Sequence, residues 1–89
     1  MPRIVFTPQL RRFIEAPEYD ASALVLRDAL EQAFAEHSLL RGYVLDDQGH
    51  LRANVVIYVD GRVVRERQRL DQALRPDAVI HVLQALSGG

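Results

Sequence analysis

The stretch from 55 to 61, Val55-Val56-Ile57-Tyr58-Val59-Asp60-Gly61, decides the fold. Its first five residues are all β-branched or aromatic, the types that favour an extended strand. Asp60-Gly61 follows directly, and this pair is preferred in two-residue hairpin turns, where both central residues need a positive φ. The stretch therefore predicts a β-hairpin whose second strand is Arg62-Val63-Val64.

Three further segments have the composition of strands. They are Ile4 to Thr7, which Pro8 ends, Pro17 to Ala21, and Val79 to Leu83, which places Ile80 and Val82 on one face. Gln9 to Ala16 lacks the Asn-Gly or Asp-Gly signature of a tight hairpin, so we expect a longer loop there. Leu70 to Leu74 resembles a single helical turn.

One segment in the first half of the chain has helical periodicity instead. Its apolar stripe follows i, i+4, i+7, i+8 and i+11 and consists of Leu26, Leu30, Ala33, Phe34 and His37. Polar residues lie on the other side, as in an amphipathic helix. We expect this helix to begin between Ser22 and Val25, with Ser22 as its N-cap. The segment from Ser38 to Leu45 is predicted to pack as a short turn against the same core.

The predicted order is strand, strand, helix, hairpin, short turn and last strand. Because strands stand on both sides of one helix, a single mixed sheet wrapped over that helix buries the apolar surfaces most economically, in an α+β arrangement of two layers. A chain of 89 residues forms one small domain. We place this domain at residues 1–83 and a flexible C-terminal tail at residues 84–89.

The composition argues against several classes of protein. The 12 acidic and 11 basic residues nearly balance, whereas a general binder of nucleic acid or acidic membranes uses a strongly basic face. The longest apolar run, Val55 to Val59, has five residues, and a membrane span needs about 20. No secretory signal is recognisable near the start. We therefore expect a cytoplasmic protein that binds neither nucleic acid nor membrane.

Cysteine and lysine are missing from the sequence. Without cysteine the chain forms no disulfide and no thiolate metal site, so any sulfur chemistry would take place on a terminus. Because all 11 basic residues are arginine, no isopeptide bond can be formed to a side chain of this protein.

Other residues that could support catalysis or metal binding form no recognised pattern. The histidines His37, His50 and His81 are scattered and lack the spacing of metal ligands, so we expect no metal site. Asp46 to His50 lacks the alternating oxygen ligands of a calcium loop and is predicted to form a turn. The sequence contains no phosphate-binding glycine loop and no recognisable pair of nucleophile and base, so an enzyme is the least supported class.

The final Gly88-Gly89 has no structural role in this scheme. The pair closes no turn and packs into no core, and glycine loses the most backbone entropy when it is ordered. A carboxylate that must reach the α-phosphate of ATP inside another protein benefits from residues without a Cβ. The pair is therefore a candidate for threading into a partner, together with Leu86 and Ser87.

A helix in the first half, strands in the second half and a final Gly-Gly together resemble the ubiquitin-like β-grasp sulfur carriers. This MoaD/ThiS-like family includes the small subunit of molybdopterin synthase and the sulfur carrier of the thiamin pathway. The resemblance extends over nearly the whole chain, and it is carried by the stretches Val5 to Leu10, Tyr43 to Arg52, Val55 to Gly61 and Gln84 to Gly89. It implies a ubiquitin-like β-grasp fold.

The resemblance also implies a function. In the family, an activating enzyme of the ThiF/MoeB type uses ATP and magnesium to adenylate the terminal glycine, here Gly89. A sulfur donor then displaces AMP and leaves a thiocarboxylate, whose sulfur is taken up by a biosynthetic partner enzyme. On this reading the chain is a carrier and not an enzyme, and it binds no cofactor itself.

Two other functions stay open. One is a ubiquitin-like modifier that is conjugated through Gly89 to lysines of other proteins. The other is a β-grasp interaction module whose tail is never activated.

The sequence also offers candidates for contact with a partner. Tyr58 is expected to point outward from its strand. Arg65, Arg67 and Arg69 form a basic cluster that would project from one side if the strand continued, where it would meet an acidic patch on the activating enzyme.

Overall fold

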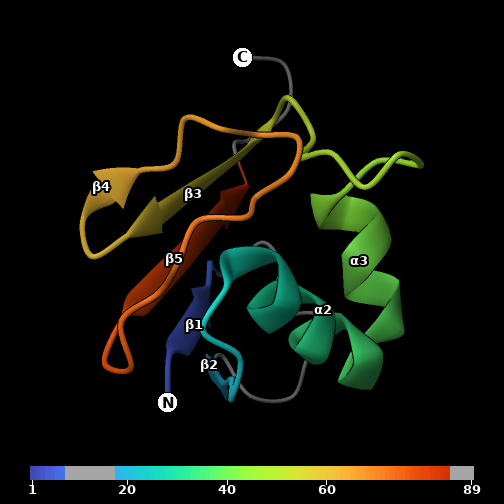
Figure 1. Cartoon of the computed structure of the whole chain (residues 1–89). Coiled ribbons are helices and arrows are strands. Elements are labelled where there is room, and N and C mark those ends of the chain that lie inside the picture. The colour runs from blue at the N-terminus through green and yellow to red at the C-terminus, as the bar shows by residue number, and fades with distance from the viewer. Residues whose placement is uncertain (8–17, 85–89) are drawn as a thin grey trace.

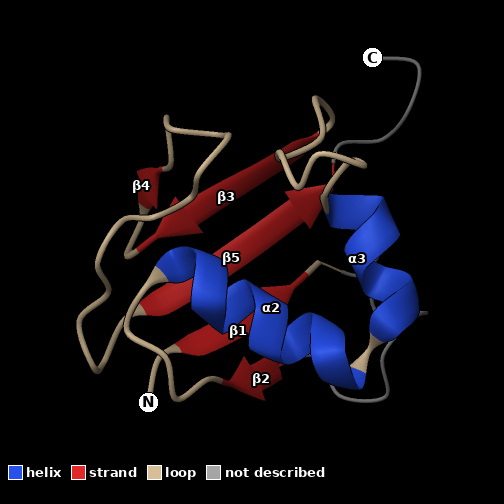
Figure 2. Ribbon diagram, turned by 45° about the vertical axis from the view of Figure 1, so that its right-hand side comes forward, coloured by secondary structure: helices blue, strands red, loops and turns tan. Residues whose placement is uncertain are grey.

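A computed structural model describes residues 1–7 and 18–84 of the chain. Its elements are the strands β1 (Arg3–Phe6), β2 (Glu18–Asp20), β3 (Val55–Val59), β4 (Arg62–Val63) and β5 (Val79–Gln84) and the helices α2 (Leu26–Glu36) and α3 (Ser38–Val44). The loop predicted at Gln9 to Ala16 lies outside the described residues. Figures 1 and 2 show the strands side by side in one sheet, with α2 crossing over the central strands and α3 beside it.

The five strands form a single mixed sheet in the order β2-β1-β5-β3-β4. β1 and β5 are parallel neighbours, and the other three pairings are antiparallel. The first and last strands of the chain therefore lie together in the middle of the sheet (Figure 1). The predicted mixed sheet over one main helix is confirmed.

The hairpin that decides the fold has the predicted turn. Asp60 has a φ of 51° and Gly61 a φ of 82°, so both central residues adopt the left-handed conformation of a type I′ turn. Aspartate is one of the few non-glycine residue types that tolerate this conformation, so it suits position 60. The Val64 amide donates to the Ile57 carbonyl at 2.8 Å, which extends the pairing by one residue beyond β4.

The main helix is shorter than its widest predicted limits. α2 begins at Leu26 after an extended Val25, and the predicted N-cap role of Ser22 is wrong, because no side chain caps the helix. Ser22 instead accepts a hydrogen bond from Gln32 Nε2 at 2.8 Å, while Gln32 Oε1 accepts one from the Ser22 amide at 2.9 Å. Ser22 is thus bonded to the second turn of α2 and does not cap the first.

Two of the connecting segments differ from their predictions. The segment after Ser38 is a second helix, α3, and not only a short turn, because Leu40 and Val44 stand four residues apart and both enter the core. Leu70 to Leu74 forms no helical turn, since Leu70 has a φ of 54° and Ala73 pairs in an isolated bridge with Val25.

The core lies between the helices and one face of the sheet. Alternate residues of the three central strands point inward and are fully buried: Ile4, Phe6, Ile57, Ile80, Val82 and Val55. They pack against the predicted stripe of α2, of which Leu26, Leu30 and Ala33 have no exposed surface. No polar or charged residue is buried among the described residues. The charged side chains therefore act at the rim, where they connect loops.

Arg27 is the most extensively bonded of these rim residues. Its Nη2 donates to the carbonyl oxygens of Gly49 at 2.6 Å and Gln68 at 2.7 Å, and its Nε donates to that of Arg69 at 3.2 Å. The side chain leaves the polar side of α2 and joins two loops that are distant in sequence. A Cβ on Gly49 would lie 3.3 Å from the guanidinium, so glycine also allows this close approach.

None of the helices among the described residues is long and apolar enough to cross a membrane.

We predict that Arg27→Leu lowers the free energy of unfolding by about 3 kcal/mol, because three carbonyl groups lose a charged donor. Urea denaturation followed by circular dichroism measures this loss. The matched control is Arg75→Leu, since the Arg75 side chain is 80% exposed and its one ion pair within the described residues is with Asp77, which is 79% exposed. We expect the control to change stability by less than about 0.5 kcal/mol. Equal losses in the two variants would contradict the role assigned to Arg27.

Three carboxylates at the rim make the stability depend on pH. The Arg41 guanidinium, which bonds Glu31 at 3.0 Å, lowers the pKa of Glu31. Hydrogen bonds from backbone amides lower the pKa of the other two carboxylates. The Arg69 amide has the largest effect on the pKa of Glu66, and the His50 amide has the largest effect on the pKa of Asp46. At acid pH the unfolded chain therefore binds more protons than the folded one, so stability rises with pH there.

We predict full stabilisation above the ordinary glutamate pKa of 4.5 and a progressive loss as the pH falls below it through the lowered values. The urea midpoint measured from pH 7 downward records this slope. Glu66→Gln should flatten it, whereas Asp71→Asn, which removes an exposed carboxylate with no hydrogen-bond partner among the described residues, should not. Identical slopes for both variants would refute the assignment.

Candidate functional site

The end of β5 is where the chain leaves the sheet. Gln84, the last described residue, pairs with Val55 at the start of β3. On its other side the Gln84 amide lies 3.5 Å from Thr7 Oγ1, next to the end of β1. Gln84, which was predicted to begin the tail, is thus the final residue of β5. The predicted tail residues Leu86, Ser87, Gly88 and Gly89 lie outside the described residues, and their roles stay predictions.

The outer face of the sheet carries a row of side chains that run across three strands. Tyr58 of β3 is paired with His81 of β5, and His81 is paired in turn with Val5 of β1. Strand alternation points these residues away from the core, which confirms the predicted outward orientation of Tyr58 and places His81 on the same face. Tyr58 is half-buried and His81 is exposed.

This face is mostly apolar and slightly hollowed. A depression of about 340 Å³ is lined by Val5, Phe6, Thr7, Tyr58, Gly61, His81 and Leu83. The described helices lie on the opposite side of the sheet (Figure 2). A sheet face with aromatic and aliphatic side chains is suited to docking another protein.

The predicted arginine row does not form. β4 ends at Val63, so the strand does not continue and Arg65, Arg67 and Arg69 do not project together from one side. Arg65 and Arg69 are exposed. Arg67 turns back instead, and its Nη2 donates to the carbonyl oxygens of Arg52 at 2.6 Å and Val55 at 2.7 Å.

Glu66 shapes the segment that carries these arginines. Its carboxylate accepts hydrogen bonds from the amides of Gln68 at 3.0 Å, Arg69 at 2.9 Å and Leu70 at 2.6 Å. Leu70 has a φ of 54°, a conformation that a buried leucine adopts only when its surroundings hold it there. The three hydrogen bonds from these amides to Glu66 supply that restraint.

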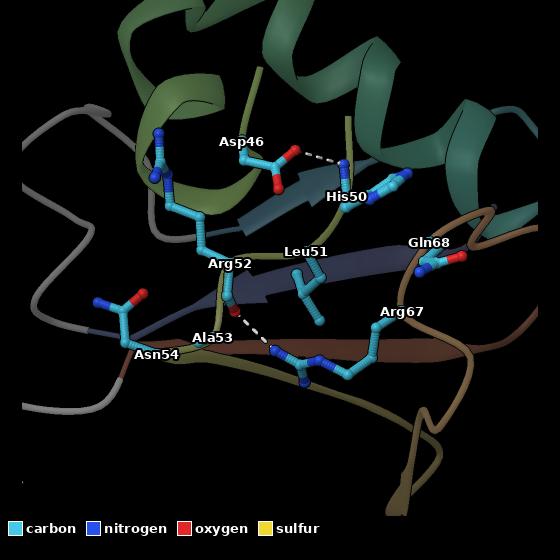
Figure 3. Close-up of a pocket in the computed structure, with 8 residues that line it drawn as sticks. All are labelled: Asp46, His50, Leu51, Arg52, Ala53, Asn54, Arg67 and Gln68. Carbon is cyan, nitrogen blue, oxygen red and sulfur yellow. Dashed lines mark hydrogen bonds between the residues drawn. The ribbon is translucent and has the colours of Figure 1, made fainter. Parts of the chain in front are cut away.

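A second hollow, of about 620 Å³, lies beside the start of β3 (Figure 3). It is lined by Asp46, His50, Leu51, Arg52, Ala53, Asn54, Arg67 and Gln68. Asp46 Oδ1 accepts the amides of Gln48 and His50, each at 2.9 Å, and Gly49 has a φ of 78°, so the turn predicted at Asp46 to His50 is confirmed. No group of three histidine, aspartate or glutamate side chains in residues 1–7 and 18–84 is arranged to hold a metal ion.

Sequence reasoning missed Arg27, Glu66 and this second hollow. Asp46, which begins a turn that contains Gly49, was a local signal for one wall of the second hollow. Nothing local marks Arg27, because its acceptors are Gly49, Gln68 and Arg69, which are distant along the chain.

The fold and the family are supported by comparison with known proteins. The ThiS family model matches residues 4–89. Among solved structures, a chain of the BexX/CysO complex of Amycolatopsis orientalis matches with a TM-score of 0.86 and 16% identity. The match covers 100% of this protein and 100% of that chain. SAMP1 of Haloferax volcanii gives 0.84 at 18% identity, with 99% and 98% of the two chains covered. CysO of Mycobacterium tuberculosis gives 0.83 at 22% identity, with 97% and 100% covered.

A search of curated proteins finds no match.

The parallel pairing of the first and last strands, inside a mixed sheet that covers one main helix, defines a ubiquitin-like β-grasp protein, and the solved structures share this fold. Within this class the chain belongs to the ThiS family, whose model matches nearly the whole sequence. The predicted fold and family are thereby confirmed. Members of this family are small carrier or modifier proteins.

Proposed function

We propose that this protein is a sulfur carrier whose working group is the carboxylate of Gly89. The observation that carries the proposal is the family match, which extends through the Gly88-Gly89 pair. The structure supports it by ending β5 at the rim of the sheet, so that residues 85–89 follow from a fixed point on a folded body. Activation and delivery take place in partner proteins.

The proposed chemistry uses two displacements. The Gly89 carboxylate attacks the α-phosphate of ATP in an activating enzyme of the ThiF/MoeB type, and pyrophosphate leaves. A sulfur nucleophile then attacks the acyl-adenylate and expels AMP, which leaves a thiocarboxylate. The first step is needed because a carboxylate is a poor electrophile and its adenylate is a good one. Magnesium and ATP belong to the activating enzyme, and the carrier holds no cofactor.

A second partner, a biosynthetic enzyme, would accept the sulfur. One of the similar structures is a complex, that of BexX with CysO, which supports the idea that a protein of this fold binds a partner protein. Because the chemistry consumes ATP, we place the carrier in the cytoplasm.

A ubiquitin-like modifier is the second candidate, since SAMP1 of Methanosarcina acetivorans, described as a small archaeal modifier protein, shares the fold with a TM-score of 0.84 at 20% identity. In that case Gly89 forms an isopeptide bond with lysines of target proteins. The chain itself has no lysine, so its own side chains cannot be targets.

We predict that incubation with an adenylating enzyme of the family, ATP, magnesium and a sulfide source exchanges one oxygen of the protein for sulfur. Intact-mass spectrometry measures the change. One alanine added after Gly89 should abolish it, because the reactive carboxylate is displaced. Gly42→Ala is the matched control, since a Cβ there meets nothing within 4 Å.

Equal modification of the extended protein would refute the sulfur-carrier proposal. Peptides with a Gly-Gly remnant on lysines of other proteins, without a thiocarboxylate, would favour the modifier instead.

We further predict that Tyr58→Ala raises the KM of the activating enzyme for the carrier about 5-fold and leaves kcat unchanged, because an aromatic contact on the docking face is lost. Steady-state kinetics of pyrophosphate release measure both constants. Tyr43→Ala, which removes an exposed tyrosine from α3, should leave KM unchanged. Equal effects of the two variants would argue against docking through the outer face.

A further inference from the structure

The second hollow lies next to the point where the chain leaves the sheet. Asn54, one of its lining residues, immediately precedes β3, and Val55 is paired with Gln84. Arg67, which lines the opposite side, bonds the Val55 carbonyl at 2.7 Å. A protein that encloses the residues after Gln84 therefore approaches this hollow as well.

Charged side chains fix the walls of the hollow through main-chain contacts. Asp46 holds the turn that ends at His50, and Arg27 joins that turn to the segment at Gln68. Glu66 holds the amide of Gln68 from the other side. The walls are thus pre-formed in the free protein, which reduces the entropy lost when a ligand binds.

Several donors in the hollow keep hydrogen-bonding capacity. Arg52 uses its Nε to bond the Gly42 carbonyl at 2.7 Å, and its two Nη atoms make no hydrogen bond within residues 1–7 and 18–84. Within the same residues, Arg67 donates hydrogen bonds from its side chain through Nη2 alone, and the side-chain amide of Asn54 has no hydrogen-bond partner. Figure 3 shows the Arg67 guanidinium directed toward the Arg52 carbonyl, while the Arg52 guanidinium points away from Arg67 and Asn54 lies beyond Ala53 along the same segment. Asp46 is the single carboxylate in the lining, and its Oδ1 already accepts two amides.

We propose that this hollow binds a carboxylate side chain of the protein that receives the Gly89 tail. The inference rests on the proposed function, because that function requires a protein to enclose the tail. Guanidinium groups match the planar geometry of carboxylates and form strong, charge-assisted hydrogen bonds with them. Five residues follow Gln84, so the length of the chain allows the reacting carboxylate to lie at most roughly 17 Å from the end of β5. An acidic residue at the rim of the partner's slot is within reach of Arg52 and Arg67.

The first arm of the test uses a hexaglutamate peptide and the whole ¹⁵N-labelled protein, without any enzyme. We expect saturable shifts of the Arg52 and Arg67 Nε–H signals and of the Asn54 side-chain amide in nuclear magnetic resonance spectra. The Arg75 signal should not move, because Arg75 precedes the start of β5, whereas the hollow lies beside Val55, which pairs with the last residue of β5. At about 0.5 M salt the shifts should disappear, because the screening length falls to roughly 4 Å.

The second arm changes the charge of the hollow without removing a contact. In low salt, Asn54→Asp should weaken peptide binding about 5-fold and Asn54→Arg should tighten it about 3-fold. The matched controls are Gln72→Asp and Gln72→Arg, because Gln72 lines a different hollow between Arg62 and Arg75. The same order of variants is expected for the KM of the activating enzyme.

Signals that fail to shift, or Asn54 and Gln72 variants that bind the peptide alike, would overturn the inference. Such a result would leave the sulfur-carrier proposal intact if the wild-type protein still gains its thiocarboxylate. A wild-type protein that binds the peptide but gains no sulfur would overturn the carrier proposal and the identity of the partner, and would leave only an anion-binding hollow.

Discussion

The parallel pairing of β1 with β5 is the constraint on which the rest of the structure depends. Both strands bury their inward residues against α2, and the pairing runs from Arg3 with Val79 to Phe6 with Val82. Because parallel neighbours end at the same edge, β5 finishes beside the end of β1, and its own last residue, Gln84, stands at that edge. The core therefore determines where the tail begins.

Around this core, polar contacts arrange the loops near the same edge. Arg27, Asp46, Glu66 and Arg67 bond mainly to main-chain groups and not to one another. A small domain has little hydrophobic energy to spare for irregular segments, so such contacts decide their shape. The Gly89 carboxylate, which we propose to be the reacting group, thus belongs to a domain with two distinct parts. The apolar core stabilises the fold, and the charged residues at the rim shape the contact surface.

The sequence was most informative where periodicity is local. The pair Asp60-Gly61, the α2 stripe up to Phe34 and the outward position of Tyr58 were predicted correctly, because each depends on neighbours within a few residues; His37, the last predicted member of the stripe, instead follows the end of α2. The predictions failed where distant groups decide. Ser22 bonds Gln32 instead of capping α2, and Arg67 turns toward the carbonyls of Arg52 and Val55, which no local pattern reveals.

The central claim is that the carboxylate of Gly89 is converted to a thiocarboxylate, and that partner enzymes catalyse the reactions. Intact-mass spectrometry of the protein isolated from its own cells, under conditions that preserve thioacids, tests it most directly. The account predicts a fraction of molecules in which one oxygen at Gly89 is replaced by sulfur. A protein that carries only an unmodified carboxylate, under every growth condition that demands sulfur transfer, would contradict it.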